Sequence, residues 1–218
     1  MKDTTLIVFA KAPVPGQTMT RLIPEIGVTG AVNLHRTLVL HTLQTATKTR
    51  FASIQLWCAP SPNHPFFLAC TRTFDVSLHT QQGSDLGERM KHAIDTALQL
   101  SKSVILIGTD CPSLTVDTLE HAADLLLQGM DTVIAPAMDG GYVMLGMTRS
   151  SPDLFHLIPW GNDNVMQITR ERLNTLGWKW RELAQHRDID RPEDLKYLDN
   201  QNLFPASHSE IFTTFPPA

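Results

Sequence analysis

Short apolar runs alternate with helical stripes along the first two thirds of the chain. Continuous apolar and β-branched runs predict buried strands at residues 6–10, 53–59, 74–78, 104–107 and 132–135. Between these runs, apolar residues at three- and four-residue steps predict helices over 31–46, 86–97 and 116–126, and a short helix is expected over 63–72. Strands that alternate with helices in this way predict a parallel sheet that is covered on both faces.

The pattern changes in the last third of the chain. A glycine pair precedes an apolar strand at 142–147, which is followed by a helix over 163–176, an edge strand over 178–183 and a final helix over 192–198. This change predicts an antiparallel strand, so the expected fold class is α/β with a mixed, mostly parallel sheet. We expect one domain over residues 1–200 and a C-terminal tail over 201–218, where prolines are frequent and periodicity is weak.

Composition narrows the class of protein. Of the 218 residues, 42% are hydrophobic and 18% charged, as in ordinary soluble globular proteins. The net charge of −4 provides no field that attracts nucleic acid. The three cysteines cannot all pair within one chain and fit no zinc motif, and no apolar run approaches the roughly 20 residues of a membrane span. The N-terminus is expected to be a strand rather than a signal peptide. We therefore expect a cytoplasmic protein without nucleic-acid or membrane partners.

Two cations follow the first predicted strand. Lys11 and Arg21 lie in a loop that two prolines stiffen. Ligands of open α/β sheets bind at the carboxyl ends of the strands, where a lysine and an arginine suit the phosphates of a nucleotide. We therefore predict a nucleotide-binding loop that includes Ala10, Lys11, Pro15, Gly16, Thr20 and Arg21.

A carboxylate follows the most apolar strand, in the segment Gly108-Thr109-Asp110-Cys111-Pro112. Asp110 is expected at the same edge of the sheet as the first loop. It would be a natural ligand there for Mg²⁺, which usually shares substrate phosphates. The alternative is an aspartate that only shapes the turn before Pro112.

Two further acidic segments occur later in the chain. In Asp188-Ile189-Asp190, both carboxylates of an extended segment point to one side, which suits a cation. The alternative, which is compatible with the first, is a helix start with Asp190 as its N-cap and Pro192 in its first turn. The glycines of Asp139-Gly140-Gly141-Tyr142 either let the backbone approach a ligand or form a tight turn, and Asp139 either faces the site or shapes that turn.

Two more segments complete the predicted site. The start of the helix over 86–97 carries small residues and backbone donors, so Gln82, Gly83 and Gly87 could contact a base or a sugar, although a capped helix start explains the same pattern. Trp160 is the tryptophan expected to line a pocket. We assign to a candidate acceptor site Asp139, Gly140, Gly141, Tyr142, Trp160 and Asp188. The sequence contains no Walker-type phosphate loop, dinucleotide-binding glycine motif or nucleophile elbow.

Four motifs, in order, resemble the rSAM/selenodomain-associated transferase 1 family. They lie at residues 9–22, 108–112, 136–142 and 188–195, and the likeness covers roughly residues 4–198. This family belongs to the nucleotide-diphospho-sugar transferase superfamily, so the resemblance implies a GT-A-like three-layer sandwich. More distantly, the first loop is similar to that of phospholactate guanylyltransferases.

The resemblance also implies roles for individual residues. Lys11 and Arg21 would contact the nucleotide phosphates, and Asp110 would bind a metal, Mg²⁺ or Mn²⁺. Asp190 resembles the second metal ligand of sugar-nucleotide cytidylyltransferases. The chain departs from the family at Gln17 and Met19, where lysines are usual. Each missing cation could weaken phosphate binding by about 1.5–3 kcal/mol if the contact is partly buried.

These features predict a metal-dependent transferase that uses a nucleotide-activated donor. The favoured reaction is nucleotidyl transfer from a nucleoside triphosphate to a small phosphorylated acceptor, with Lys11, Arg21 and Asp110 as catalytic residues. A glycosyltransferase that uses a nucleotide-diphospho-sugar is the first alternative. A non-catalytic nucleotide-binding module is the second, and the loss of the two lysines favours it.

Overall fold

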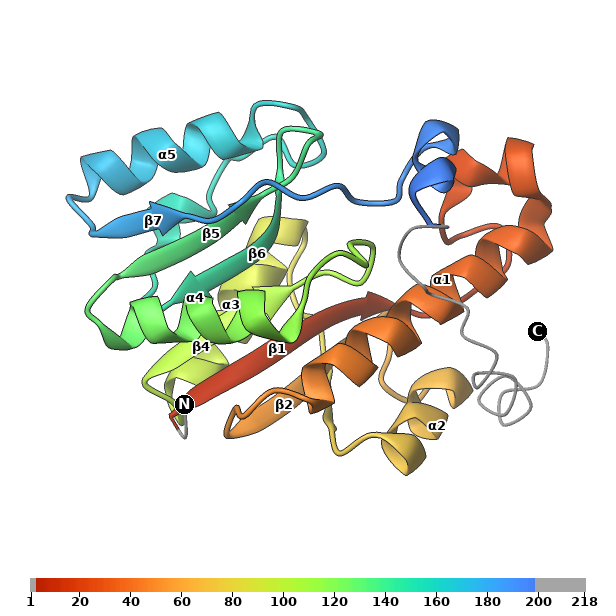
Figure 1. The fold of residues 1–218 in the computed structure, drawn as a ribbon, viewed down its shortest axis with the longest axis horizontal. Helices are drawn as coiled ribbons and strands as arrows, with labels where there is room; N and C mark the ends of the chain where they lie inside the picture. The colour runs from red at the N-terminus through yellow and green to blue at the C-terminus, as the bar shows by residue number, and fades with distance from the viewer. Residues whose placement is uncertain (1–2, 199–218) are drawn as a thin grey trace.

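The computed structural model describes residues 3–198, which form a seven-stranded sheet with helices on both faces (Figure 1). The strand order is β3-β2-β1-β4-β6-β5-β7. The strands are β1 (Thr4–Lys11), β2 (Ser53–Ala59), β3 (Ser77–Thr80), β4 (Ser103–Ile107), β5 (Thr132–Pro136), β6 (Tyr142–Met147) and β7 (Trp180–Glu182). Strand β6 is antiparallel to β4 and β5, and the other pairs are parallel. The predicted α/β fold with a mixed sheet is therefore confirmed; the predicted tail over 201–218 lies outside the described residues.

Five α-helices and three 3₁₀ helices of the described chain connect the strands. They are η1 (Thr20–Leu22), α1 (Ile23–Thr47), α2 (Pro65–Thr73), α3 (Leu86–Leu98), α4 (Val116–Leu127), η2 (Pro152–Leu154), α5 (Val165–Thr175) and η3 (Pro192–Tyr197). Capping side chains determine where several of these helices begin. The Asp85 carboxylate accepts a hydrogen bond from the Glu88 backbone N–H at the start of α3, and the Thr115 hydroxyl accepts one from Thr118 at the start of α4. None of the helices within residues 3–198 has the length and apolar character of a membrane span.

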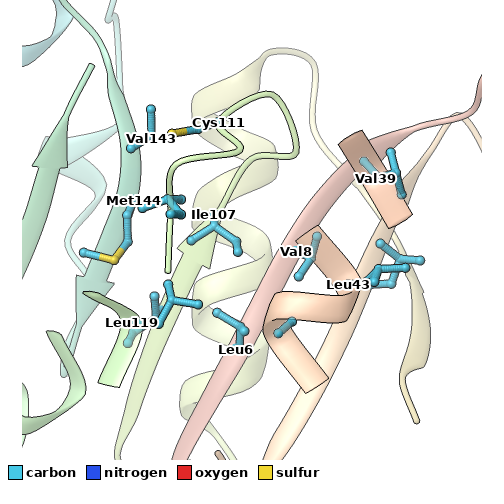
Figure 2. Close-up of a cluster of buried hydrophobic side chains, with 14 of the residues drawn as sticks. Leu6, Val8, Val39, Leu43, Ile107, Cys111, Leu119, Val143 and Met144 are labelled. Carbon is cyan, nitrogen blue, oxygen red and sulfur yellow. The ribbon is translucent and has the colours of Figure 1, made fainter. Parts of the chain in front are cut away.

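Two hydrophobic clusters attach these helices to opposite faces of the sheet. Helices α1, α2 and α4 contribute to the first cluster, together with Leu6 and Val8 of β1. Figure 2 shows Val39 and Leu43 of α1 near β1, and Leu119 of α4 near the lower part of β4. Helices α3 and α5 pack on the other face, against Ile7 and other residues of the second cluster. Successive side chains of β1 point to opposite faces of the sheet, so this strand packs against both helical layers. Each fully buried aliphatic side chain stabilises the fold by roughly 1.5–3 kcal/mol.

Three predicted elements differ from the structure. The helix expected over 31–46 is α1, which begins earlier, at Ile23, and its backbone leaves the helical conformation at Gly27 (φ +71°). The third strand was expected over 74–78 but is β3 (Ser77–Thr80), because Phe74 closes α2: its N–H donates to the Cys70 carbonyl at 2.9 Å, and its ring is buried. The last predicted helix is the 3₁₀ helix η3, which begins at Pro192 as predicted, but its N-cap is Arg191 rather than Asp190. The Asp194 carboxylate accepts hydrogen bonds from the N–H groups of both residues, so Asp190 is not the helix cap. This corrects the capping alternative and leaves the Asp190 carboxylate available to other partners.

Three segments meet at the carboxyl edge of the sheet. Strands β1 and β4 end there side by side, and β6 begins there because it runs antiparallel to β4. The chain after β7 also crosses this edge on its way to η3, beside the start of α1 (Figure 1). A hydrogen bond of 2.8 Å from the Ile189 N–H to the Asp110 carbonyl fixes this crossing. The fold therefore brings residues 10–21, 108–110, 142–143 and 189–190 to one place.

Candidate active site

A hollow of about 500 Å³ opens at this edge of the sheet. The predicted cations Lys11 and Arg21 line it, and so do the predicted metal ligands Asp110 and Asp190. Ala10, Thr20 and Tyr142, three further residues of the predicted site, also line the hollow. The volume lies within the range of small-molecule sites. The structure thus gathers into one cavity the four charged side chains on which the predicted chemistry depends.

Lys11 is held in place at the end of β1. The backbone of the next residue, Ala12, donates a hydrogen bond to the Ala59 carbonyl after β2, at 2.7 Å. The Nε2 atom of His35, on α1, lies 2.9 Å from the Lys11 carbonyl oxygen. Because a carbonyl only accepts, His35 donates this hydrogen bond. Burial lowers the pKa of His35, and the Lys11 charge lowers it further, so a neutral histidine braces the strand end.

The loop after Lys11 turns sharply before it reaches Arg21. Met19 adopts left-handed backbone angles (φ +48°), an uncommon conformation for a residue with a side chain. Gln17, Thr18 and Met19 all line the hollow. The two positions at which the resemblance leads us to expect lysines therefore line the cavity with uncharged side chains.

Arg21 and Asp190 form an ion pair across the hollow although 169 residues separate them in the chain. Their side chains remain 59% and 37% exposed, so the pair contributes little to stability by itself. An exposed pair exchanges partners at low cost. A ligand phosphate could therefore take over Arg21, and a cation could take over Asp190.

Asp110 lines the same hollow and follows β4 by three residues. Its carboxyl folds back over Gly108, where an added Cβ would lie 2.9 Å from Oδ1. The side chain is accessible to solvent, but it lies in a hollow that protein surrounds on several sides. This partial removal from water raises the pKa of Asp110, and the charges of Asp190 and Asp139 raise it further. A carboxylate disfavoured in this way would gain from a bound cation.

Asp188 belongs to the same acidic group, although it does not line the hollow. Burial raises the pKa of its carboxyl to about 6, and the charges of Asp139, Asp110 and Asp190 act in the same direction. Four carboxylates therefore lie near enough to influence one another.

An Asp188→Asn variant is expected to gain stability over the wild type as the pH rises from about 4 to above 6. The pKa of Asp188 in the folded protein lies above its ordinary value of 3.8, so its stabilising contribution is complete below that value and is lost as the pH passes about 6. Asparagine cannot ionise and avoids this loss. Urea unfolding of both proteins across this pH range measures the difference, and a difference independent of pH would refute the placement of Asp188.

The donor set of the hollow suits a hard divalent cation. Asp110 and Asp190 would supply carboxylate oxygens, which Mg²⁺ and Mn²⁺ prefer. Within residues 3–198, no group of three or more His, Cys, Asp or Glu side chains is arranged to hold a metal ion. Two carboxylates alone would therefore need oxygens from a substrate phosphate, which is how Mg²⁺ usually binds beside nucleotides.

Several residues of the predicted site lie outside the lining of the hollow: Pro15, Gly16, Gln82, Gly83, Gly87, Asp139, Gly140, Gly141, Trp160 and Asp188. Packing explains two of the glycines. A Cβ at Gly87 would lie 2.6 Å from the Trp160 ring nitrogen, and one at Gly140 would lie 1.9 Å from the Asp163 carbonyl oxygen. The Asp139 carboxylate accepts a hydrogen bond from the Gly141 N–H at 2.9 Å, so it shapes the turn while its charge still reaches Asp110.

Several lining residues were absent from the predicted site, among them His35, Gln81 and Arg89. His35 falls within a helical stripe, where a histidine gives no sign of the loop that it will contact. Gln81 and Arg89 belong to the segment that was predicted to contact a base or sugar, and their polarity next to small residues was a usable signal. The prediction selected Gln82 and the glycines of that segment rather than Gln81 and Arg89.

The fold and its relatives define the class of protein: an enzyme of the nucleotide-diphospho-sugar transferase superfamily, as predicted. The chain belongs to the family described as "Uncharacterized protein conserved in bacteria (DUF2064)", whose model matches residues 42–162. The structure is similar to that of a candidate nucleotide-diphospho-sugar transferase from Desulfovibrio desulfuricans G20, with 30% identity, a TM-score of 0.83, and coverage of 95% of this chain and 91% of that one. These findings support the predicted superfamily and the assignment as an enzyme.

More distant structures share the fold alone. CMP:2-keto-3-deoxy-manno-octonic acid synthetase, solved with CTP, is 9% identical with a TM-score of 0.59, over 91% of this chain and 97% of that one. Rv0371c from Mycobacterium tuberculosis H37Rv, solved with manganese, is 16% identical with a TM-score of 0.51, over 90% of this chain and 97% of that one. No curated protein matches the sequence.

Proposed function

We propose that the protein transfers a nucleotidyl group from a nucleoside triphosphate to a small phosphorylated acceptor. The observation that carries this proposal is the shared hollow, in which Lys11 and Arg21 face Asp110 and Asp190. Cations beside carboxylates suit a metal-bound polyphosphate better than any neutral ligand. The superfamily of the Desulfovibrio relative and the nucleotide and manganese bound to the two distant structures support the same class of donor.

The chain's own residues would position the donor and offset its charge. An oxygen of the acceptor phosphate would attack the α-phosphorus and form a new P–O bond, while the bond to the β-phosphate oxygen breaks and pyrophosphate leaves. This chemistry depends on alignment and charge neutralisation rather than on a covalent protein intermediate. Lys11 at the fixed end of β1 and Arg21, released from Asp190, would stabilise the negative charge on the leaving group.

Asp110 and Asp190 would hold the divalent cation. A bound Mg²⁺ or Mn²⁺ would supply charge neutralisation at the phosphate oxygens. The raised pKa of Asp110 and the exposed ion pair of Asp190 both fit this role, because each carboxylate gains a better partner when a cation arrives.

Glycosyl transfer from a nucleotide-diphospho-sugar is the second candidate. Gln17 and Met19 line the hollow where the resemblance leads us to expect lysines, so the cavity carries less positive charge than a triphosphate would use. A diphosphate donor needs fewer cations.

A binding and turnover panel tests the proposed function. The full chain is titrated with nucleoside triphosphates and with nucleotide sugars, with and without Mg²⁺, and pyrophosphate release is followed with a pool of phosphorylated acceptors. We expect metal-dependent stabilisation by triphosphates and release of pyrophosphate. Stabilisation by nucleotide sugars alone would favour glycosyl transfer, and metal-independent binding without turnover would favour a binding module. The absence of binding to either class of ligand would refute both transferase proposals.

A Gln17→Lys variant is expected to bind triphosphate more tightly, by about threefold to tenfold. The new ammonium would face the hollow, and its gain is limited because Gln17 is exposed and solvent screens the charge. Isothermal titration at low salt measures the effect. Gln128→Lys adds the same charge after α4, at the opposite edge of the sheet, and should leave affinity unchanged. Equal gains in both variants would mean that only net charge matters.

A further inference from the structure

One side of the hollow is apolar and lies on the face of the sheet that α3 covers. This apolar wall consists of Phe9, Leu86, Met90, Leu106 and Tyr142. Two polar side chains accompany it: Gln81, which follows β3, and Arg89, which projects from α3. An apolar surface with a few fixed polar groups suits the flat face and the polar edge of a heteroaromatic ring.

Two carbonyl groups fix the orientation of the Gln81 amide. Its Nε2 donates to the Trp57 carbonyl at 2.8 Å and to the Ala10 carbonyl at 3.3 Å. Carbonyl oxygens only accept, so the amide cannot be turned over without the loss of both hydrogen bonds. The Oε1 atom meets no donor from the described part of the chain and is not buried. Gln81 therefore presents a hydrogen-bond acceptor at the cavity.

A backbone carbonyl likewise fixes the guanidinium of Arg89. Its Nε donates to the Gly83 carbonyl at 3.0 Å. Gly83 itself lies against α3, where a Cβ would come within 2.7 Å of the Arg89 backbone nitrogen, so the loop is held tightly to the helix. The two terminal nitrogens of Arg89 pair with no residue between 3 and 198 and are not buried. Arg89 therefore offers two terminal donors to the same hollow to which Gln81 offers an acceptor.

Two adjacent donors from one guanidinium, together with one acceptor from Gln81, are complementary to some bases and not to others. Cytosine presents O2 and N3 as acceptors next to its N4 donor, and guanine presents N7 and O6 next to its N1 donor. Uracil alternates acceptor, donor and acceptor, and adenine likewise places its N6 donor between two acceptors, N7 and N1, so neither base offers two adjacent acceptors beside a donor. A phosphate is disfavoured at this place because the oxygens of Gln81 and Gly83 would repel it.

We infer that Gln81 and Arg89 select the base of the donor nucleotide, in favour of guanine or cytosine over adenine and uracil. This inference rests on the proposed function, because it requires that a nucleotide occupies the hollow. It also orients that nucleotide: the base lies against the apolar wall, and the phosphates extend toward Lys11, Arg21 and Asp110.

Titration of the full chain with GTP, CTP, ATP and UTP in the presence of Mg²⁺ tests the inference. We expect GTP or CTP to bind at least about tenfold more tightly than ATP and UTP. Arg89→Lys keeps the charge but loses the paired donors, so the preference should fall below about threefold while ATP and UTP bind as before. Gln81→Met, which removes the acceptor, should reduce the preference in the same way. Arg72→Lys on α2 is the matched control and should retain it.

The outcomes separate the inference from the proposed function. Equal binding of all four nucleotides, or a preference that survives both Arg89→Lys and Gln81→Met, would overturn the base selection and leave the nucleotide site intact. A preference for ATP or UTP would overturn it as well. If no nucleotide binds, both the inference and the proposed function fail. If the preference is confirmed, the choice between GTP and CTP shows which base edge meets Arg89.

Discussion

An Asp110→Asn variant will lose metal-dependent nucleotide binding while it keeps its fold. Asparagine is almost the same size and still fits over Gly108, but it lacks the charge that a divalent cation needs. We expect affinity for a Mg²⁺-nucleotide to fall by roughly 100-fold or more, equivalent to about 2.7 kcal/mol. The melting temperature at pH 7 should be unchanged or higher, because partial removal from water and the neighbouring carboxylates raise the pKa of Asp110, so its ionised form is disfavoured in the folded state.

Isothermal titration and thermal melting of the same preparations measure the two effects. Asp75→Asn provides a matched control, because Asp75 is an exposed residue before β3, at the opposite edge of the sheet. It should bind nucleotide as the wild type does. If Asp110→Asn binds the Mg²⁺-nucleotide with wild-type affinity, Asp110 is not a metal ligand; if it melts far below the wild type, Asp110 has a structural role that the hollow does not suggest.

Gly140→Ala is expected to be the most destabilising single-methyl change in this part of the molecule. Its Cβ would lie 1.9 Å from the carbonyl oxygen of Asp163, and the backbone there has a φ of +92°. A backbone oxygen cannot rotate away as a side chain can. The Gly140 carbonyl also accepts a hydrogen bond of 2.8 Å from the Met166 N–H at the start of α5. Strain and overpacking together should cost more than about 3 kcal/mol.

Gly161→Ala separates the two contributions. Gly161 has nearly the same φ, +88°, but nothing lies within 4 Å of its Cβ position. The Gly161→Ala variant should therefore lose only the free energy of unfolding that backbone strain costs, about 1–2 kcal/mol. Urea unfolding of the two variants measures both values. Equal losses would mean that the segment around Asp163 moves freely away from Gly140, and would remove the packing explanation for that glycine.

Most of the secondary structure could be predicted from the sequence, because the spacing of apolar residues reflects the local backbone geometry. Strands β2 and β6 begin and end where the apolar pattern predicted, and α3 and α4 follow their stripes and caps. The error at β3 shows the limit. Phe74 is apolar and next to a strand, but it packs under α2 and ends that helix. An apolar residue reports burial, and it does not report which element buries it.

The site was predictable where charge and position coincide. Lys11 and Asp110 each follow an apolar strand, and both line the hollow. The pairing of Arg21 with Asp190 was not predictable from spacing, because it depends on the path of the chain after β7. Gln81 and Arg89 were missed because their role depends on which carbonyls they meet: those of Ala10 and Trp57 for Gln81, and that of Gly83 for Arg89.

The amino-acid sequence by itself determined where strands and helices form, that the sheet is mixed, and that cations and carboxylates follow strand ends. Each of these features follows from the spacing of residues that are close together in the sequence. Only the tertiary structure decided which groups face each other. The antiparallel course of β6 and the crossing segment that Ile189 anchors to Asp110 brought four distant segments to one cavity, because side-chain contacts follow strand order and chain path rather than distance along the sequence.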